Sequence, residues 1–462
     1  MSGTKTMNKM GTKPMFPLLM SMSLPAMFSM LIQALYNIVD SIFVSQLGSD
    51  ALNAVSLAYP LQMIMISFAV GTGVGVNSLI ARRLGAKEYD EASDAATHGI
   101  VIAVATWVLF VFIGAFFSRS FISIFSDKVS IVTYGTQYLS VVLFASLGCL
   151  LSVMAEKSLQ ATGNMIIPMI TQLLGAVINI ILDPLFIHGY WFFPKLEVLG
   201  AAVATVIAQF ISMFFIISIL LFKKHEIKIN FKKFKLKGTV LFNIYVVGFP
   251  AIIMQSIGSV MVSGINGIIS AFASSVAVKE AYINIFGIYF KLQSFVFMPV
   301  FGLSQGTSPI IGFNYGARNK KRMYSALKIC LAVAVVIMCL GFLLFQFGSQ
   351  FLLSLFEADK LTVDLGIPAF KIISLCFIPA AVGITFSTLF QAVGKGIMSM
   401  LMSILRQLIV LLPSAFFLAQ IELSVLWYAF PIAEAVALAV ALLMFVYLTK
   451  HDFKKLDKEV TE

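Results

Sequence analysis

The chain has 462 residues, of which 60% are hydrophobic and only 11% are charged. A soluble domain of this length needs many more charged residues on its surface, so the composition excludes that class. The formal net charge is +11. The basic residues lie mostly in short segments between apolar runs, where they act as topology signals and contact anionic headgroups, and this pattern argues against a nucleic-acid partner.

Twelve apolar runs are long enough to cross the hydrocarbon core of a bilayer, which takes roughly 20 residues in helical form. The sequence therefore predicts an all-α polytopic membrane protein with twelve transmembrane helices. Several runs exceed the bilayer thickness, which indicates tilted or kinked helices. The predicted spans cover residues 15–46, 53–81, 93–117, 131–155, 163–187, 198–222, 241–271, 280–314, 324–347, 364–392, 396–419 and 423–449.

The first predicted span carries four polar residues with helical spacing. Gln33, Tyr36, Asn37 and Asp40 follow one another at i, i+3, i+4 and i+7, which places them on one face of the helix. An acidic side chain inside a span costs a few kcal/mol to bury and is rarely kept without a use. This face is therefore a candidate functional surface.

Polar residues recur in the fifth and sixth spans. Gln172, Asn179 and Asp183 are spaced i, i+7 and i+11, and Thr205 and Gln209 lie one turn apart. Together with the first span, they predict a polar interior in the N-terminal half. Tyr138 in the fourth span could approach the same region.

Two interpretations of these polar residues remain open. In the functional one, Asp40 and Asp183 form a carboxylate pair that binds a proton or a sodium ion, with oxygen ligands nearby. In the structural one, the same groups only hydrogen-bond to neighbouring helices. We favour the functional interpretation for the two aspartates and leave the question open for Thr205 and Tyr138.

Other charged residues lie within or at the ends of spans. Glu156 closes the fourth span, where it either pairs with Lys157 at the interface or faces a cavity and attracts cationic substrates. In the C-terminal half, charge pairs between helices are the default expectation, and the sequence leaves open the roles of Lys291, Lys371, Arg406 and Glu434.

The chain also contains an internal repeat. The strongly basic segment of residues 223–240 lies near the midpoint and predicts a cytoplasmic linker between two six-helix lobes, residues 1–222 and 241–462. A shift of 231 residues supports this division. Six spans in each half give a parallel repeat, so we expect two lobes around a central cavity that work by alternating access. The shift superimposes Gly71, Gly75, Ile80, Gly85 and Ala86 on Gly302, Gly306, Ile311, Gly316 and Ala317, and Gln160-Ala161-x-Gly163 on Gln391-Ala392-x-Gly394.

The loops also predict orientation and exclude other classes of protein. One set of loops, which includes both termini, holds most of the Lys and Arg residues, so the N- and C-termini are expected in the cytoplasm, with the protein in the inner or plasma membrane. No Walker A, HExxH or Gly-x-Ser-x-Gly sequence occurs, so we expect neither an enzyme nor a cofactor. Gly71-x-x-x-Gly75 indicates close helix packing.

These features resemble the multidrug and toxic compound extrusion (MATE) family over essentially the whole chain. Glu156 and Asn179-x-x-x-Asp183 are most similar to the bacterial MepA-like branch. The resemblance rests on the two homologous halves, on Leu24-Pro25 and Phe249-Pro250, on Asp40 in Asp-x-x-x-Val-x-x-Leu-Gly, and on Gly85-Ala86 and Gly316-Ala317.

Members of this family export organic cations in exchange for protons or sodium ions. The resemblance implies a cation-coupling site in the N-terminal lobe, and the acidic residues in its cavity imply contacts with cationic drugs. The interiors of spans seven and ten lack the coupling carboxylates of another branch, which disfavours sodium coupling in the C-terminal lobe. The coupling set is Asp40, Asn179, Asp183, Thr205 and Tyr138, and the substrate-binding set is Glu156, Asp183, Gln33, Tyr36 and Asn37.

The expected partners are small cationic amphipathic drugs and the lipid bilayer, with H⁺ or Na⁺ as coupling ion and a monomer as the working unit. The nearest rival is a flippase for lipid-linked oligosaccharide or peptidoglycan precursors. Its pyrophosphate cargo requires a cationic cavity, whereas the predicted N-terminal interior is acidic. The sequence leaves the substrate list, the coupling ion and the stoichiometry open.

Overall fold

The computed structural model describes residues 8–191, 193–223, 225–356, 358–454 and 456, and the side chains of residues 36–38, 40, 41 and 233 lie outside this description. Within the described residues the secondary structure is helical throughout, with no strand. Ten helices are long and apolar enough to cross a membrane by themselves, and two further spans are pairs of helices with a sharp bend. The protein is therefore an all-α membrane protein with twelve transmembrane segments, as the sequence predicts.

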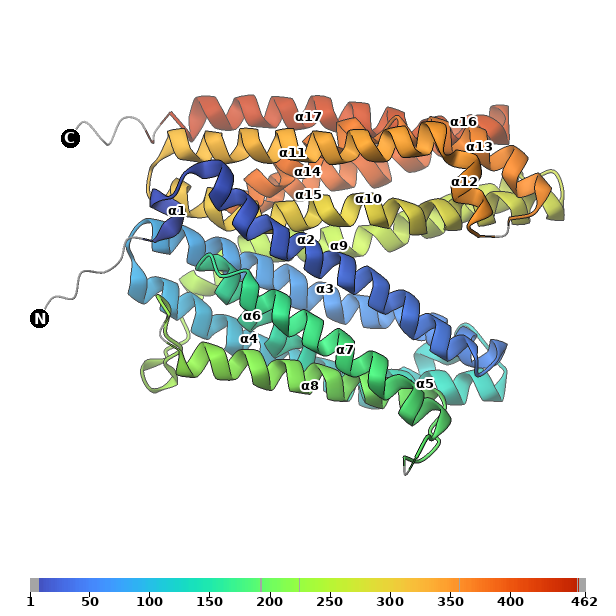
Figure 1. The fold of residues 1–462 in the computed structure, drawn as a ribbon, viewed down its shortest axis with the longest axis horizontal. Coiled ribbons are helices and arrows are strands. Elements are labelled where there is room, and N and C mark those ends of the chain that lie inside the picture. The colour runs from blue at the N-terminus through green and yellow to red at the C-terminus, as the bar shows by residue number, and fades with distance from the viewer. Residues whose placement is uncertain (1–7, 192, 224, 357, 455, 457–462) are drawn as a thin grey trace, which may run out of the picture. The chain divides into compact units, whose positions relative to one another are not determined.

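Most helices follow one another with short connections, and the longest connection covers residues 223–237 (Figure 1). The first part of the chain contains α1 Lys9–Thr12, α2 Met15–Ser45, α3 Ser49–Gly85, α4 Tyr89–Ser123, α5 Val129–Phe144, α6 Leu147–Ala161, α7 Ile166–His188 and α8 Val198–Phe222. The second part contains α9 Gly238–Phe272, α10 Val276–Gly316, α11 Lys320–Phe347, α12 Ser349–Ser354, α13 Lys360–Ser374, α14 Phe377–Ala392, α15 Gly396–Ile404, a π-helical segment Leu405–Leu411, α16 Leu412–Ile421, a 3₁₀ segment Leu423–Tyr428 and α17 Ala429–His451.

The predicted spans at residues 131–155 and 364–392 are the two bent pairs. α5 and α6 meet at 45°, and α13 and α14 also meet at 45°. Neither break contains a proline. Instead, the backbone tightens into i→i−3 hydrogen bonds, from Ser146 N to Leu143 O and from Cys376 N to Ile373 O. Such a local 3₁₀ turn ends one helix and starts the next in a new direction.

The internal repeat is visible in the backbone. α3 and α10 end at Gly85 and Gly316, which are 231 residues apart, and the same interval separates the ends of α6 and α14. The left-handed residues that follow these helices recur at the same interval. They are Lys87 (φ 65°) and Arg318 (φ 56°), and Gly163 (φ 89°) and Gly394 (φ 86°). Two halves with the same unusual turns at matching positions confirm the predicted repeat.

The repeated Gly-x-x-x-Gly pairs lie where two helices approach closely. A Cβ atom on Gly75 of α3 would lie 2.2 Å from the carbonyl oxygen of Ile244 in α9. A Cβ atom on Gly306 of α10 would lie 2.6 Å from Cα of Ser23 in α2. In both halves the glycines thus allow backbone-to-backbone packing, which confirms their interpretation as packing residues.

The chain divides into two compact units, one of residues 28–252 and one of residues 1–27 with 253–462. The divisions fall inside α2 and α9, so each of these helices contributes to both units. The predicted lobes of residues 1–222 and 241–462, with a linker of residues 223–240, follow chain order and stay a prediction. In the unit of residues 28–252, α7 packs along α8, and α3 packs against α4, α5 and α6 (Figure 1).

Candidate functional site

A polar cavity of about 200 Å³ lies inside the unit of residues 28–252. Its wall comes from α6, α7 and α8, with a contribution from α2. Glu156 is the charged residue of this wall, which contains no Lys or Arg. The lining residues are Ile32, Gln33, Cys149, Ser152, Val153, Glu156, Thr171, Gln172, Gly175, Ala176, Asn179, Thr205, Ala208, Gln209 and Ser212.

Helical spacing places these residues on the inner faces of their helices. On α6, Cys149, Ser152 and Glu156 follow at i, i+3 and i+7. Two glycines bring the helices close enough to enclose the space. A Cβ atom on Gly175 of α7 would lie 2.6 Å from Ser212 Oγ of α8, and one on Gly148 of α6 would lie 3.2 Å from the backbone of α8. The small residues therefore set the narrow spacing of the three helices.

A hydrogen-bonded group joins α7 to α8 at the cavity. The amide nitrogen of Asn179 donates to Asp183 Oδ1 at 3.1 Å and to Thr205 Oγ1 at 3.2 Å. Asp183 is 0% exposed, Asn179 1% and Thr205 4%. A buried carboxylate is costly unless polar neighbours compensate it. The Asn179 amide therefore links Asp183 to Thr205 and keeps a carboxylate, an amide oxygen and a hydroxyl close together.

Glu156 forms a second acidic point on the wall. Its Oε2 accepts a hydrogen bond from Gln172 Nε2 at 2.9 Å, and the residue is 6% exposed. The carboxyl group of Glu156 therefore lies on the wall of the cavity. Its chain neighbour Lys157 is also buried, so the two alternatives from the sequence, a pair with Lys157 and a role in the cavity, both stay predictions.

Three amide oxygens of the wall have unused accepting capacity. Gln172 Oε1, Asn179 Oδ1 and Gln209 Oε1 are buried and accept no hydrogen bond from the part of the chain that the structure describes. Buried polar atoms normally have partners, so such a group calls for a water or a ligand. Acceptors that converge on one cavity suit a cation or a molecule rich in hydrogen-bond donors.

The structure brings together part of the predicted site. Asn179, Asp183 and Thr205 are in contact, and Gln33 and Glu156 line the adjoining cavity. Tyr138 is buried on α5 and donates to Gln62 Oε1 at 3.5 Å, but it does not line this cavity. Three further residues of the predicted site belong to α2, but their side chains lie outside the described part of the structure. They are Tyr36, Asn37 and Asp40.

Several residues that line the polar cavity were not predicted from the sequence. Cys149 and Ser152 precede Glu156 by two turns and one turn, so the helical spacing that points to the glutamate also points to them. Thr171 and Ser212 carry no such signal. Ser212 Oγ donates to the backbone oxygen of Thr171 at 3.3 Å, a contact between helices that depends on their register.

The charged residues of the second half lie elsewhere. In the unit that contains residues 253–462, Arg406 Nη1 pairs with Glu434 Oε1 at 2.9 Å. Arg406 belongs to the π-helical segment Leu405–Leu411. Lys291 Nζ lies 5.8 Å from the ring centre of Phe356, and Lys371 is exposed. The expected interhelical charge pair therefore exists for Arg406 and Glu434.

The donor set bears on the kind of ion that the site could hold. Among the described residues no group of three His, Cys, Asp or Glu side chains is placed to bind a metal. Asp183, Asn179 and Thr205 instead offer oxygen atoms, which hard cations prefer. A proton or a sodium ion therefore fits the chemistry of this group better than a transition metal.

The sequence model of the MatE family matches residues 25–185 and 250–417, most of the chain and both halves of the repeat. The chain belongs to the MATE family. Glu156, Gln172, Asn179 and Asp183 fall within the first matched range, whereas Thr205 and Gln209 lie between the two ranges.

Individual MATE proteins match nearly end to end. The chain is 27% identical over 444 residues to the multidrug export protein MepA of Staphylococcus aureus (strain MRSA252), covering 95% of this chain and 94% of that protein. It is 28% identical over 446 residues to MepA of Staphylococcus haemolyticus (strain JCSC1435), covering 96% and 95%. A solved multidrug resistance MATE family transporter of the MOP superfamily, in its outward-facing conformation, matches with a TM-score of 0.89 and 25% identity over 99% of this chain and 100% of that one.

Proposed function

We propose that this MATE protein exports organic cations across the membrane in exchange for protons or sodium ions. The observation that carries the proposal is the polar cavity. A buried carboxylate and three amide oxygens with unused accepting capacity face one space whose wall holds no basic residue. A cation with an apolar body satisfies the acceptors and packs against the remaining wall. The relatives named as multidrug export proteins support the same reading.

Coupling is assigned to Asp183, Asn179 and Thr205, together with Asp40 as the predicted second carboxylate. A proton or sodium ion that binds to this group removes negative charge next to the cavity. The bound drug then loses part of its electrostatic stabilisation and dissociates. α2 contains Pro25, where one backbone hydrogen bond is missing, so repacking of α2 near this residue is the proposed conformational response.

The energetics require such coupling. Export of one positive charge against a negative-inside membrane potential costs about 2.3 kcal/mol per 100 mV. One incoming H⁺ or Na⁺ offsets that electrical cost, and the concentration gradient of the ion supplies the remaining free energy. The two homologous halves support alternating access as the transport mode.

We also propose a membrane orientation and an oligomeric state for the protein. Both termini lie in the cytoplasm, because most Lys and Arg residues occur on their side of the membrane. A monomer suffices, and the coupling ion takes the place of a cofactor. MATE proteins are transporters and not enzymes, in line with the expectation from the sequence.

The flippase alternative fits the site less well. A pyrophosphate headgroup needs cationic partners, and the cavity wall has a glutamate but no Lys or Arg. Lys291, Lys371 and Arg406, the basic residues within predicted spans of the C-terminal half that leave room for such a cargo, lie outside this wall: Arg406 is paired with Glu434 and Lys371 is exposed. Lys291 lies beside an aromatic ring.

Equilibrium binding to the purified protein tests the cargo assignment. We expect Glu156→Gln to weaken binding of ethidium, a monovalent apolar cation, by about ten-fold or more, because it removes a charge that interacts in a partly desolvated site. Glu422→Gln, which removes an exposed carboxylate, is the matched control. Fluorescence anisotropy measures the affinity. Unchanged ethidium binding by Glu156→Gln would contradict the cargo assignment.

A further inference from the structure

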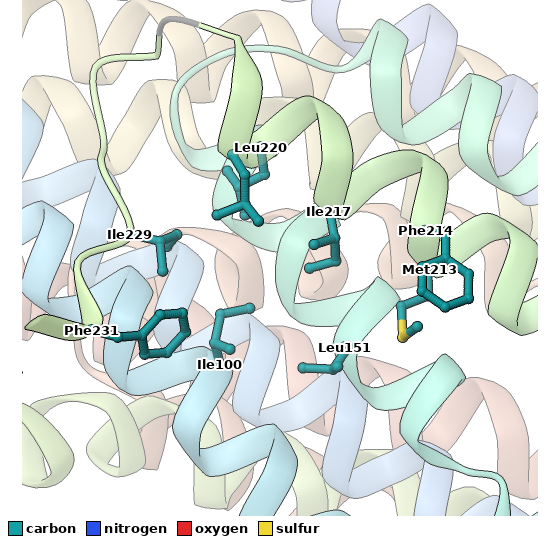
Figure 2. A pocket seen from close by; sticks show the side chains of 9 residues that line it. Ile100, Leu151, Met213, Phe214, Ile217, Leu220, Ile229 and Phe231 are labelled. Carbon is teal, nitrogen blue, oxygen red and sulfur yellow. The ribbon is translucent and has the colours of Figure 1, made fainter.

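A second cavity lies at the end of α8, apart from the polar one. It has a volume of about 150 Å³ and shares no lining residue with the polar cavity. Figure 2 shows side chains of α8 facing those of the segment that follows it, with side chains of α4 and α6 on the other side. All nine lining residues are apolar, and they are Ile100, Leu151, Met213, Phe214, Ile217, Leu220, Leu221, Ile229 and Phe231.

The segment after α8 is a fixed wall of this cavity. The backbone N–H of Lys228 donates to Ser93 Oγ at 3.0 Å, and the backbone N–H of Asn230 donates to Thr97 Oγ1 at 3.4 Å. Ser93 and Thr97 lie one turn apart on α4. These two bonds hold the backbone on either side of Ile229, so its side chain keeps its place in the cavity wall.

A second anchor lies at the end of the same segment. The backbone N–H of Lys237 donates to His98 Nε2 at 3.0 Å, and the His98 ring packs against Phe234 with 4.8 Å between ring centres. The Lys237 ammonium pairs with Asp94. This hydrogen-bonded ion pair raises the pKa of Lys237. The segment is thus bonded to α4 near Ile229 and again at Lys237. The cavity wall is therefore formed by ordered backbone.

Two exposed lysines adjoin the cavity wall in the sequence. Lys228 and Lys232 are exposed and are the chain neighbours of Ile229 and Phe231, with Cα atoms about 3.8 Å apart. Glu226 is the one carboxylate residue in the sequence from 223 to 237. An apolar cavity with exposed lysines next to two of its lining residues suits an amphiphile that carries negative charge better than a cationic molecule.

We propose that this cavity binds one acyl chain of an anionic phospholipid, with its headgroup on Lys228 and Lys232. Phe214, Leu221 and Phe231 are each more than half exposed, so the rest of the chain can continue along α8 into the bilayer. Basic segments next to a transmembrane helix attract anionic headgroups. The proposal is independent of the proposed cargo and coupling ion.

Native mass spectrometry of the delipidated full-length protein tests the charge of the ligand. We expect dioleoyl phosphatidylglycerol to bind about 25-fold more tightly than dioleoyl phosphatidylcholine, about five-fold for each lysine. The double variant Lys228→Gln/Lys232→Gln loses this preference. The control Lys321→Gln/Lys454→Gln changes two exposed lysines elsewhere and keeps it. Equal affinities of the two lipids for wild-type protein would overturn the proposal.

Filling the cavity tests the place of the acyl chain. Ile217→Trp and Ile229→Trp put bulk into the cavity and are expected to weaken binding of both lipids at least ten-fold. Ile219→Trp makes the same change two residues away on α8, outside the cavity, and leaves binding unchanged. Thermal unfolding in detergent shows that each variant is folded.

Three outcomes would overturn the placement of an acyl chain in this cavity. Lipid binding to folded Ile217→Trp and Ile229→Trp as tight as to Ile219→Trp would exclude the cavity. Equally tight binding of glycerophosphoglycerol, which has the headgroup without the chains, would show an anion site. Ethidium binding that is lost on Ile217→Trp while phosphatidylglycerol binding persists would make the cavity a cargo site.

Discussion

At the scale of single residues, Asn179 holds the candidate coupling site together. Its one amide nitrogen donates to both Asp183 and Thr205. A buried carboxylate that loses one of its donors loses part of the compensation for its desolvation, about 1–3 kcal/mol or more for a charged group. The geometry of Asp183 therefore depends on a neighbour that itself carries no charge.

Asn179→Ala tests this dependence. We expect a fall in unfolding free energy of about 1–3 kcal/mol, and a loss of ion-driven transport, because Asp183 loses the hydrogen bond from Asn179 and Thr205 loses the bond that joins it to α7. Thermal unfolding in detergent and ethidium flux in proteoliposomes measure the two effects. Asn53→Ala, which removes an exposed asparagine on α3, should leave both unchanged. An Asn179→Ala protein with wild-type stability and flux would contradict this role.

The sequence predicts some of these contacts and not others. Asn179 and Asp183 lie on one helix, so their contact follows from i, i+4 spacing. Thr205 lies on another helix, and its partner depends on how α7 and α8 are aligned, which helical periodicity does not encode. For the same reason Tyr138, predicted as a neighbour of the site, faces Gln62 on α3 instead of the cavity.

At the scale of elements, close helix pairs depend on particular glycines. Gly75 faces the backbone of α9, where a Cβ atom would lie 2.2 Å from the oxygen of Ile244. A backbone carbonyl cannot rotate away as a flexible side chain can. A Cβ atom on Gly258 of α9, in contrast, would meet no other helix or side chain within 4 Å among the described residues, so this position tolerates a larger residue.

Alanine substitutions at Gly75 and Gly258 form a matched pair that tests the packing role of Gly75. Gly75→Ala should lower the melting temperature in detergent, because α3 and α9 must move apart. Gly258→Ala should leave it unchanged or raise it, because alanine favours a helix by up to about 1 kcal/mol over glycine. Size-exclusion chromatography after a heating series measures both. Equal melting temperatures for the two variants would contradict the packing role of Gly75.

The helices themselves are largely predictable, whereas their breaks are not. Apolar run length identifies all twelve spans, but α5–α6 and α13–α14 bend without a proline or glycine at the break. Local i→i−3 hydrogen bonds produce these bends, and composition gives no sign of them. No residue pattern in the sequence predicts the π-helical segment Leu405–Leu411 either.

At the scale of the whole molecule, the repeat is the most reliable inference from sequence. The offset of 231 residues found from a few glycines and glutamines also relates helix ends and left-handed turns. The grouping of helices into compact units is harder to foresee. The first residues of α2 pack on α10, and those of α9 pack on α3, so contact partners do not follow chain order.

The contacts of the segment of residues 223–237 also could not be predicted from the sequence. Its charge predicts a cytoplasmic linker, but it does not predict that the backbone is bonded to Ser93, Thr97 and His98 of α4. His98 looks isolated in the sequence because its partner, the backbone of Lys237, is 139 residues away. Contacts of side chains with a distant backbone leave no residue pattern to detect.

Ion-driven flux in proteoliposomes tests the central claim, which is that Asp183 couples cation export to an ion gradient. Ethidium movement is recorded under an imposed pH gradient and then under a Na⁺ gradient, for wild-type protein, Asp183→Asn and the control Glu422→Gln. We expect one gradient to drive ethidium in the wild type and the control, and neither gradient to drive it in Asp183→Asn. Flux of Asp183→Asn equal to the wild type, or no ethidium movement by wild-type protein under either gradient, would contradict the account.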